Sequence, residues 1–396
     1  MNGLHEVLRE LIAADTVSAK ANVAAFERVA ERVEALGCRV RLQRWEEAGA
    51  EKANLIAWAG PPREGGLVLS GHMDIVPFED QPGWTRDPLV LAAEGDRLYG
   101  RGTTDMKGFI AQCIQALERL DFGSLTRPVA LLFTSDEEVG CQGAGRLVGE
   151  LPALFEECPQ PKLCWIGEPT SWRVSQSHKG IVVLDVSVRG EGGHSSLPEA
   201  GVNAISVAAR LIGEIGTVQA ELRGRRSGKW AALFPEAPYT TFNIGTIRGG
   251  TASNMIAEDC HFDVSYRPLP DEDPRQVARL VRERLEALDP VEWGSERPAR
   301  VEVSETLVAP GMDTPRGSAL EVALGEVVGD REPGGVPFCT DGGQLAAAGI
   351  DSLVCGPGDL DQAHQPNESL SRAAFERGPD VICDVVRRLC ADAEAG

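Results

Sequence analysis

Two residues that could serve a metal site follow an apolar, strand-like run of this 396-residue chain. Leu67–Asp74 reads Leu-Val-Leu-Ser-Gly-His-Met-Asp, so a strand-like segment leads into His72 and Asp74. Positions two apart on an extended backbone face the same side, so both side chains could work together. An imidazole can give one nitrogen to a metal while a carboxylate orients the ring or tunes a neighbouring ligand. The alternative is a solvated loop after a buried strand.

Further acidic residues and a histidine occupy comparable positions: Asp105, Glu137, Glu138, Glu168 and His364. Each also has an ordinary structural explanation. Asp105 could cap a helix, the adjacent glutamates could lie in a solvated loop or near a helix terminus, and Glu168 and His364 could be surface or loop residues. In an α/β sheet, however, functional groups collect at the carboxyl ends of the strands. We therefore expect these side chains to gather at one edge of one sheet.

Two histidines and several carboxylates are suitable ligands for a pair of divalent ions. Carboxylates can bridge two metals, and neutral imidazoles suit zinc. A two-metal site polarises an acyl oxygen and supplies hydroxide at neutral pH. A carboxylate that binds no metal can then act as general base. The consecutive Glu137 and Glu138 offer one residue for each role, because adjacent side chains do not readily face the same point.

The elements that would position these residues alternate between strands and helices at both ends of the chain. The strands there are continuously apolar, which indicates an α/β sheet covered on both faces. Between them, residues 178–305 read β-α-β-β-α-β, the order of a ferredoxin-like unit. We therefore expect a domain of residues 1–177 and 306–396 interrupted by a smaller domain of residues 178–305.

The periodicity of apolar residues predicts the individual elements. Predicted helices cover residues 3–13, 22–36, 107–120, 143–150, 202–222, 274–288, 316–328, 341–348 and 370–392. Predicted strands cover residues 39–45, 54–59, 67–71, 129–134, 163–166, 181–188, 240–248, 259–267, 299–305 and 351–355.

The composition disfavours several classes of function. There are 39 basic and 60 acidic residues, and the net charge of −21 disfavours binding to nucleic acids or anionic membranes. No apolar stretch is long enough to span a bilayer, and the N-terminus lacks the pattern of a signal peptide. Ten scattered cysteines without a CxxC pair indicate reduced thiols in a cytoplasmic protein. Residues 140–145 are glycine-rich but lack the GxGxxG spacing of a nucleotide site.

Four motifs around the candidate ligands resemble those of a known enzyme family. They are Gly71–Asp74 (GHMD), Gly102–Gly108 (GTTDMKG), Asp136–Glu138 (DEE) and Gly167–Thr170 (GEPT). Together they look like the signatures of the acetylornithine deacetylase and succinyl-diaminopimelate desuccinylase family. Its members are two-zinc amidohydrolases related to aminopeptidases and carboxypeptidases. The resemblance covers nearly the whole chain and implies a zinc-aminopeptidase-like α/β domain with an inserted ferredoxin-like lid or dimerisation domain.

The resemblance implies a metal-binding role for five residues. His72, Asp105 and Glu168 would hold one ion. Asp105, Glu138 and His364 would hold the other, so that Asp105 bridges the two. Zn²⁺ is the expected metal, with Co²⁺ as the alternative.

Three further residues would serve the chemistry if the resemblance holds. Glu137 would be the general base, moving a proton from the attacking water to the leaving amine, and Asp74 would orient His72. His194, in the glycine-rich segment Gly192–Ser196, matches a histidine that stabilises the tetrahedral oxyanion. A donor aimed at developing negative charge lowers a barrier, which fits that role. The alternative for His194 is a flexible loop.

The resemblance also points to substrate-binding residues. Asn254 and Arg267 match positions that hold the α-carboxylate of the substrate, which an arginine can grip with two parallel hydrogen bonds. For Arg267, an ion pair at a strand end is the alternative. Thr340, in the run Cys339–Gly343, should line the same cleft.

Additional stretches resemble the deacetylase branch more closely than the desuccinylase branch, among them Trp84–Pro88, His178–Gly180 and Gln362–Pro366. The resemblance therefore implies hydrolysis of an N-acyl amino acid, foremost N²-acetyl-L-ornithine, to L-ornithine and acetate for arginine biosynthesis. It also implies a homodimer formed through the inserted domain. The alternatives within the family are desuccinylase, aminoacylase and glutamate carboxypeptidase activity. The alternative of another class is a non-catalytic binding protein on the same fold.

Overall fold

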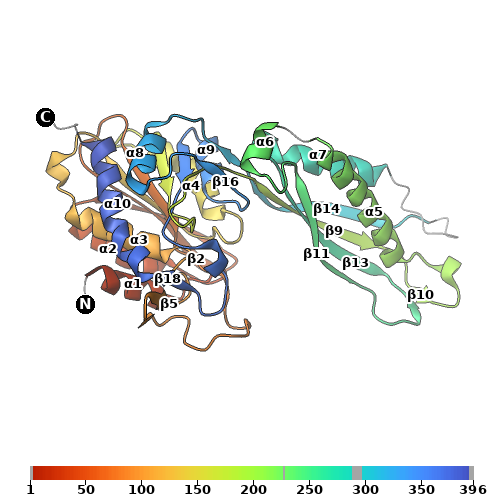
Figure 1. Ribbon diagram of the computed structural model, residues 1–396. Helices are drawn as coiled ribbons and strands as arrows, with labels where there is room; N and C mark the ends of the chain where they lie inside the picture. Colours follow the sequence, from red (N-terminus) through yellow and green to blue (C-terminus); the bar gives the residue numbers. More distant parts are fainter. Residues whose placement is uncertain (1–2, 226–227, 288–296, 392–396) are drawn as a thin grey trace. The chain divides into compact units, whose positions relative to one another are not determined.

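The computed structural model describes residues 3–225, 228–287 and 297–391 (Figure 1). The chain divides into two compact units. The first unit combines Met1–Ser177, Met312–Gly335 and Thr340–Gly396. The second unit combines His178–Gly311 and Val336–Cys339.

A nine-stranded sheet forms the centre of the first unit. Its order is β1-β2-β6-β3-β7-β17-β8-β15, and β16 pairs with β8. The four strands β6, β3, β7 and β17 are parallel, whereas β1 and β2 join the sheet antiparallel. The strands are β1 (Arg39–Glu47), β2 (Ala50–Ala59), β3 (Leu67–His72), β6 (Val129–Thr134), β7 (Leu163–Ile166), β8 (Ser175–His178), β15 (Met312–Asp313), β16 (Gly334–Val336) and β17 (Asp351–Val354).

Helices cover both faces of this sheet, as the continuously apolar strands predict. One core joins α1, α2, α3, α8 and α10 to strand residues such as Leu55 and Leu131. The opposite core joins α4 and α9 to the alternate residues, such as Ile56 and Leu132. The helices are α1 (Gly3–Ala13), α2 (Val23–Ala35), α3 (Lys107–Arg119), α4 (Gln142–Leu154), α8 (Ala319–Val328), α9 (Gly342–Ala347) and α10 (Arg372–Cys390).

A small second sheet of the first unit has the order β18-β5-β4. Its strands are β4 (Ala92–Glu94), β5 (Arg97–Tyr99) and β18 (Ser369–Ser371). The antiparallel pair β18–β5 places Ser369 opposite Tyr99, so it joins the chain shortly before Asp105 to the chain shortly after His364. The sequence patterns predicted none of these strands, because three residues are too few to show a period of two.

The second unit is built on a four-stranded antiparallel sheet of order β11-β13-β9-β14. Helices α5 and α7 pack on one face of it through a separate core. In chain order the main elements read β-α-β-β-α-β, so the predicted ferredoxin-like unit is confirmed. The last strand continues beyond its predicted end at residue 305. The elements are β9 (Ile181–Arg189), β10 (Gly193–His194), α5 (Ala204–Arg223), α6 (Gly228–Leu233), β11 (Thr241–Gly249), β12 (Met255–Ile256), β13 (Asp259–Arg267), α7 (Pro274–Glu286) and β14 (Arg300–Ala309).

The structure also bears on the expectations about membrane-spanning segments and disulfide bonds. None of the helices described is both long and apolar enough to cross a membrane. No disulfide joins any of the ten cysteines in the described part of the chain, and nine of them are buried.

Candidate metal centre

Three neighbouring parallel strands end side by side and carry four of the candidate residues. β3 ends at His72, Glu137 and Glu138 follow β6, and Glu168 follows β7. Because β6 and β7 pair with the two sides of β3, their carboxyl ends meet at one edge of the sheet. The topology therefore brings together residues that lie far apart in the sequence.

Gly167 allows helix α3 to approach this edge closely. A side-chain carbon added at Gly167 would lie 1.9 Å from Cγ of Phe109 in α3, far inside van der Waals contact. Only glycine, which has no side-chain carbon, permits this approach. Since α3 begins two residues after Asp105, its close packing places that carboxylate at the strand ends.

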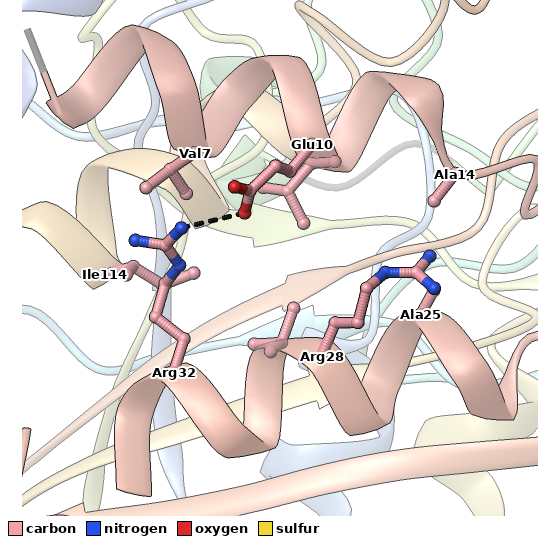
Figure 2. Close-up of a pocket in the computed structure, with 9 residues that line it drawn as sticks. Val7, Glu10, Ala14, Ala25, Arg28, Arg32 and Ile114 are labelled. Atoms are coloured by element: carbon pink, nitrogen blue, oxygen red, sulfur yellow. Dashed lines mark hydrogen bonds and ion pairs between the residues drawn. The ribbon is translucent and has the colours of Figure 1, made fainter. Parts of the chain in front are cut away.

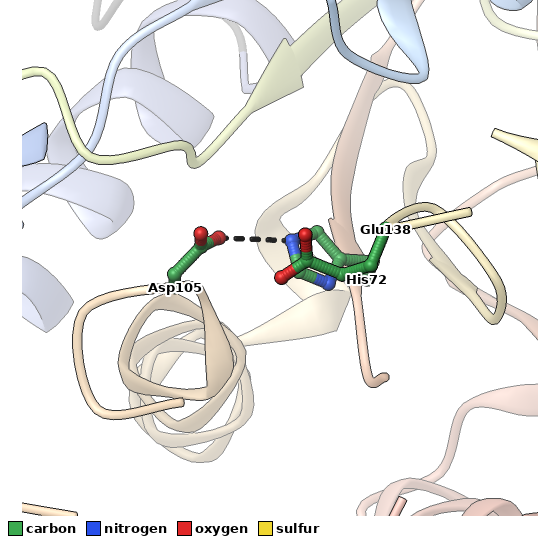
Figure 3. A group of neighbouring side chains, drawn as sticks. All are labelled: His72, Asp105 and Glu138. Atoms are coloured by element: carbon green, nitrogen blue, oxygen red, sulfur yellow. Dashed lines mark hydrogen bonds and ion pairs between the residues drawn. The ribbon is translucent and has the colours of Figure 1, made fainter. Parts of the chain in front are cut away.

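Asp105 lies between the two candidate histidines. Its Oδ1 is 3.0 Å from Nε2 of His72, and its Oδ2 is 3.1 Å from Nε2 of His364. Figure 3 shows the side chains of Asp105 and Glu138 beside the imidazole of His72. The two oxygens of one carboxylate thus face two different imidazoles, an arrangement in which Asp105 can bridge two cations.

The remaining two carboxylates flank this arrangement. Oε2 of Glu138 is 3.0 Å from Nε2 of His364, and Oε1 of Glu168 is 3.7 Å from Nε2 of His72. Among the described residues, three groups have ligand atoms that all lie within 4.8 Å of one another, namely His72–Asp105–Glu138, His72–Glu137–Glu168 and Glu137–Cys141–Asp341. Mixed imidazole and carboxylate donors at these separations suit a zinc-like divalent ion.

The electrostatics of the cluster favour bound cations. Burial and the charge of Asp105 together raise the pKa of Glu138 to about 7, against the opposing effect of His364. Burial also raises the pKa of Glu168 well above its ordinary value, with Asp105 adding to the rise and His72 opposing it. The partners Asp105 and Glu138 raise the pKa of His364 to about 10. Carboxylates that destabilise one another's charge in this way would be stabilised by divalent ions, so the residues fit a metal centre.

Asp74 contacts both the His72 ring and the turn that carries Glu137 and Glu138. Nδ1 of His72 lies 3.0 Å from the main-chain oxygen of Asp74 but 3.5 Å from the nearer carboxylate oxygen. The carboxylate also accepts hydrogen bonds from the backbone N–H groups of Glu137 and Glu138, at 3.1 and 3.2 Å, and from the hydroxyl of Ser18 at 2.7 Å. Asp74 therefore lies against the His72 ring with its main-chain oxygen and its carboxylate, and its side chain binds the backbone of the 137–138 turn.

Glu137 lies beside His72 and Glu168, and its pKa is raised. Burial raises its pKa well above the ordinary value, His72 opposes the rise, and Glu168 and Asp341 add to it. Sγ of Cys141 lies 3.5 Å from Oε1 of Glu137. A glutamate with a raised pKa is a stronger base than an exposed one, which suits proton transfer near neutral pH.

A buried ion pair supports the same turn and was not expected from the sequence. Nζ of Lys52, on β2, donates to Oδ1 of Asp136 at 2.7 Å and also to the main-chain oxygen of Ser18. Both side chains are buried, and Asp136 has φ of 58°, in the left-handed region. The sequence held no clear signal for this pair, because Lys52 precedes the predicted strand at residues 54–59, and a buried charge becomes evident only from the fold.

The proposed oxyanion and carboxylate residues belong to the second unit. His194 is exposed on β10, and its Nδ1 lies 2.7 Å from the hydroxyl of Ser196. Asn254 lies near His194, because its main-chain oxygen accepts a hydrogen bond from the N–H of Ser195 at 3.1 Å. Arg267 is the last residue of β13 and lies opposite Thr241 in the register.

Thr340 belongs to the first unit and is fully buried. Its hydroxyl accepts a hydrogen bond from the N–H of Gly342 at 3.0 Å, at the start of α9. The neighbouring Asp341 accepts a hydrogen bond from the hydroxyl of Thr134, the last residue of β6. The 340–341 segment therefore lies at the same carboxyl edge as the cluster.

A pocket between α1 and α2 lies apart from these residues (Figure 2). Its lining is largely apolar, including Val7 and Ile114, and Arg32 donates to Glu10 across it at 2.8 Å. None of the candidate ligands lines this pocket, so we assign it no part in the metal centre.

Comparison with known proteins identifies the class as metal-dependent hydrolases. Residues 68–388 match the model of the peptidase family M20/M25/M40. Acetylornithine deacetylase of Proteus mirabilis is 35% identical over 393 residues, covering 97% of this chain and 96% of the relative. The chain therefore belongs to peptidase family M20/M25/M40, and the resemblance inferred from its motifs is confirmed.

Solved structures agree on the fold. An M20 family metallo-carboxypeptidase from Sulfolobus solfataricus matches with a TM-score of 0.76 at 18% identity, covering 98% of this chain and 99% of that chain. A Bacillus subtilis protein described as a dinuclear metal binding peptidase matches with a TM-score of 0.63 at 14% identity, covering 97% of this chain and 96% of that chain.

Proposed function

We propose that this protein hydrolyses the amide bond of N²-acetyl-L-ornithine and releases L-ornithine and acetate. The choice of substrate rests on the 35% identity to an acetylornithine deacetylase over 97% of the chain. The geometry supports the reaction type, because Asp105 lies between two histidines and Glu137 stands beside them.

The proposal includes two divalent ions, with Zn²⁺ as the first choice and Co²⁺ as the alternative. His72, Asp105 and Glu168 would hold one, and Asp105, Glu138 and His364 the other. The bridging position of Asp105 is supported by its two short contacts, one from each oxygen. Divalent ions at such a centre polarise an acyl oxygen and make water more acidic.

The protein residues would then carry out the proton transfers. Glu137 takes one proton from the attacking water and delivers it to the nitrogen of the leaving amine, so that water and amide become acetic acid and free amine; the acid then gives its proton to the amine, which leaves acetate and the ammonium form of ornithine. The carboxylate of Asp74 holds the backbone of the 137–138 turn, which limits the positions that Glu137 can adopt. Raised basicity at Glu137 favours the first of these transfers.

The second unit would supply contacts to the substrate. We propose that His194 donates to the developing oxyanion and that Asn254 and Arg267 hold the α-carboxylate, with Thr340 supporting the cleft from the first unit. Residues 178–305 would thus form a lid, through which two chains would pair as a homodimer.

The direct test is a substrate panel with zinc-loaded protein. Release of free amine would be followed from N²-acetyl-L-ornithine, N-succinyl-L,L-diaminopimelate, N-acetyl-L-methionine and a dipeptide. We expect the highest kcat/KM with acetylornithine. Faster cleavage of another substrate would overturn the assigned substrate while leaving the hydrolase mechanism in place.

A further inference from the structure

A buried network joins the turn that carries Asp105 to the loop that carries His364. Glu368 is fully buried, and its Oε1 accepts hydrogen bonds from the N–H groups of Thr104 and Asp105 at 2.9 and 3.0 Å. Its Oε2 accepts from the N–H of Gly102 at 3.0 Å. One carboxylate thus binds three backbone groups of a single turn, which fixes the backbone beneath the proposed bridging ligand.

Arg101 extends this network toward the histidine. It is buried, and its Nη1 donates to Oε2 of Glu368 at 2.9 Å and to the main-chain oxygen of Gln365 at 3.3 Å. Its Nη2 donates to Oε1 of Gln81. The amide of Gln81 in turn donates to the main-chain oxygen of His364 at 2.6 Å.

The network therefore holds both ends of the short contact between Asp105 and His364. One end is fixed by Glu368, and the other by Gln81 and Arg101. His364 needs such support, because its side chain is 52% exposed and its backbone has φ of 62° in a loop. Without the network, an exposed loop histidine would have few restraints on its distance from Asp105.

We infer that Arg101 and Gln81 are positioning residues that set the affinity of the ion held by Asp105, Glu138 and His364. This inference rests on the proposed two-metal centre and adds the residues that shape one of its two sites. Among the described residues, neither Arg101 nor Gln81 contacts His72 or Glu168. The ion held by His72, Asp105 and Glu168 should therefore depend on them less. Residues that orient metal ligands typically change affinity about 10- to 100-fold when they are replaced.

The test is calorimetric titration of metal-free protein with Zn²⁺. Gln81→Met keeps the length of the side chain and removes its hydrogen bonds. We expect it to weaken one of two Zn²⁺ sites about 10- to 100-fold and to leave the other unchanged. Arg101→Met should weaken the same site at least as much. Arg101→Met removes the cation that pairs with the buried carboxylate of Glu368 and can therefore destabilise the fold. The thermal unfolding of each metal-free variant should be measured beside the titrations.

Arg97→Met provides the matched control. Arg97 lies on β5 and donates to the hydroxyl and main-chain oxygen of Ser369 at 2.7 and 2.9 Å, and it makes no described contact with Gln81 or His364. The variant Arg97→Met should be less stable than the wild type, and its affinity for Zn²⁺ should not fall at one site alone. If Gln81→Met binds Zn²⁺ with wild-type affinity at both sites, the inference is overturned but the proposed two-metal centre stands. Failure of the wild type to bind two Zn²⁺ ions would overturn the proposed centre together with it.

Discussion

The carboxylate of Asp74 shows how one residue can serve a metal centre without binding the metal. Its side chain is fully buried and accepts three hydrogen bonds, two of them from the backbone of Glu137 and Glu138. Burial alone would raise its pKa, but His72, Ser18 and the N–H of Glu137 lower it below the ordinary value. The side chain therefore remains an acceptor that determines where the adjacent glutamates point.

Replacing Asp74 by Asn should separate this role from metal binding. The new amide places an N–H₂ donor where a carboxylate oxygen accepted a hydrogen bond, so one buried N–H or hydroxyl loses its acceptor. We expect a loss of about 1–3 kcal/mol in the free energy of unfolding, measured with urea, together with a lower kcat. Asp121→Asn is the control, since Asp121 also accepts a backbone N–H, from Gly123, but is exposed. Unchanged stability and kcat in Asp74→Asn would contradict this role.

At the scale of elements, the ends of strands were predictable from the sequence and the contacts between their loops were not. The apolar run 129–134 predicts β6 with its observed limits, so Glu137 and Glu138 could be placed after a strand end. The network around Arg101 depends on three-residue strands and on side chains that bind backbone groups far away in the sequence. Periodicity carries no information about such partners, and only the fold reveals them.

The ion pair between β2 and the loop after β6 gives a second prediction at this scale. Lys52→Met leaves the carboxylate of Asp136 buried without its partner, which should cost about 3–5 kcal/mol in the free energy of unfolding. The double variant Lys52→Met, Asp136→Asn should recover part of that loss. Lys20→Met is the control, because Lys20 pairs with Asp15 and Glu79 at the exposed surface and should change stability little. A similar effect of Lys52→Met and Lys20→Met in urea unfolding would refute a special role for the buried pair.

At the scale of the whole molecule, the two units have separate apolar cores, and all the candidate metal ligands belong to the first. From the change between an α/β pattern and a β-α-β-β-α-β pattern, the sequence predicts a smaller domain of residues 178–305, whereas the second unit combines His178–Gly311 and Val336–Cys339. His194, Asn254 and Arg267 all fall within the inserted domain of residues 178–305 that the sequence predicts. Chains with independent cores commonly depart from two-state unfolding.

Zinc should therefore stabilise the two units unequally. Binding to the native first unit at 100 times the dissociation constant stabilises it by about 2.7 kcal/mol. Differential scanning calorimetry should show two transitions, of which added Zn²⁺ raises only one. Leu184→Ala, in the core of the second unit, should cost about 2–5 kcal/mol and lower the other transition. A single transition that moves as a whole with Zn²⁺ would count against this picture.

The most direct measurement is turnover of N²-acetyl-L-ornithine by Glu137→Gln, with bound zinc counted in the same preparation. A glutamine has nearly the shape of the glutamate but cannot accept the proton, so kcat should fall about 10²- to 10⁴-fold while two Zn²⁺ ions remain bound. Glu150→Gln, an exposed position on α4, should behave as the wild type. Full activity in Glu137→Gln, with two zinc ions bound, would contradict the role of Glu137 as the general base.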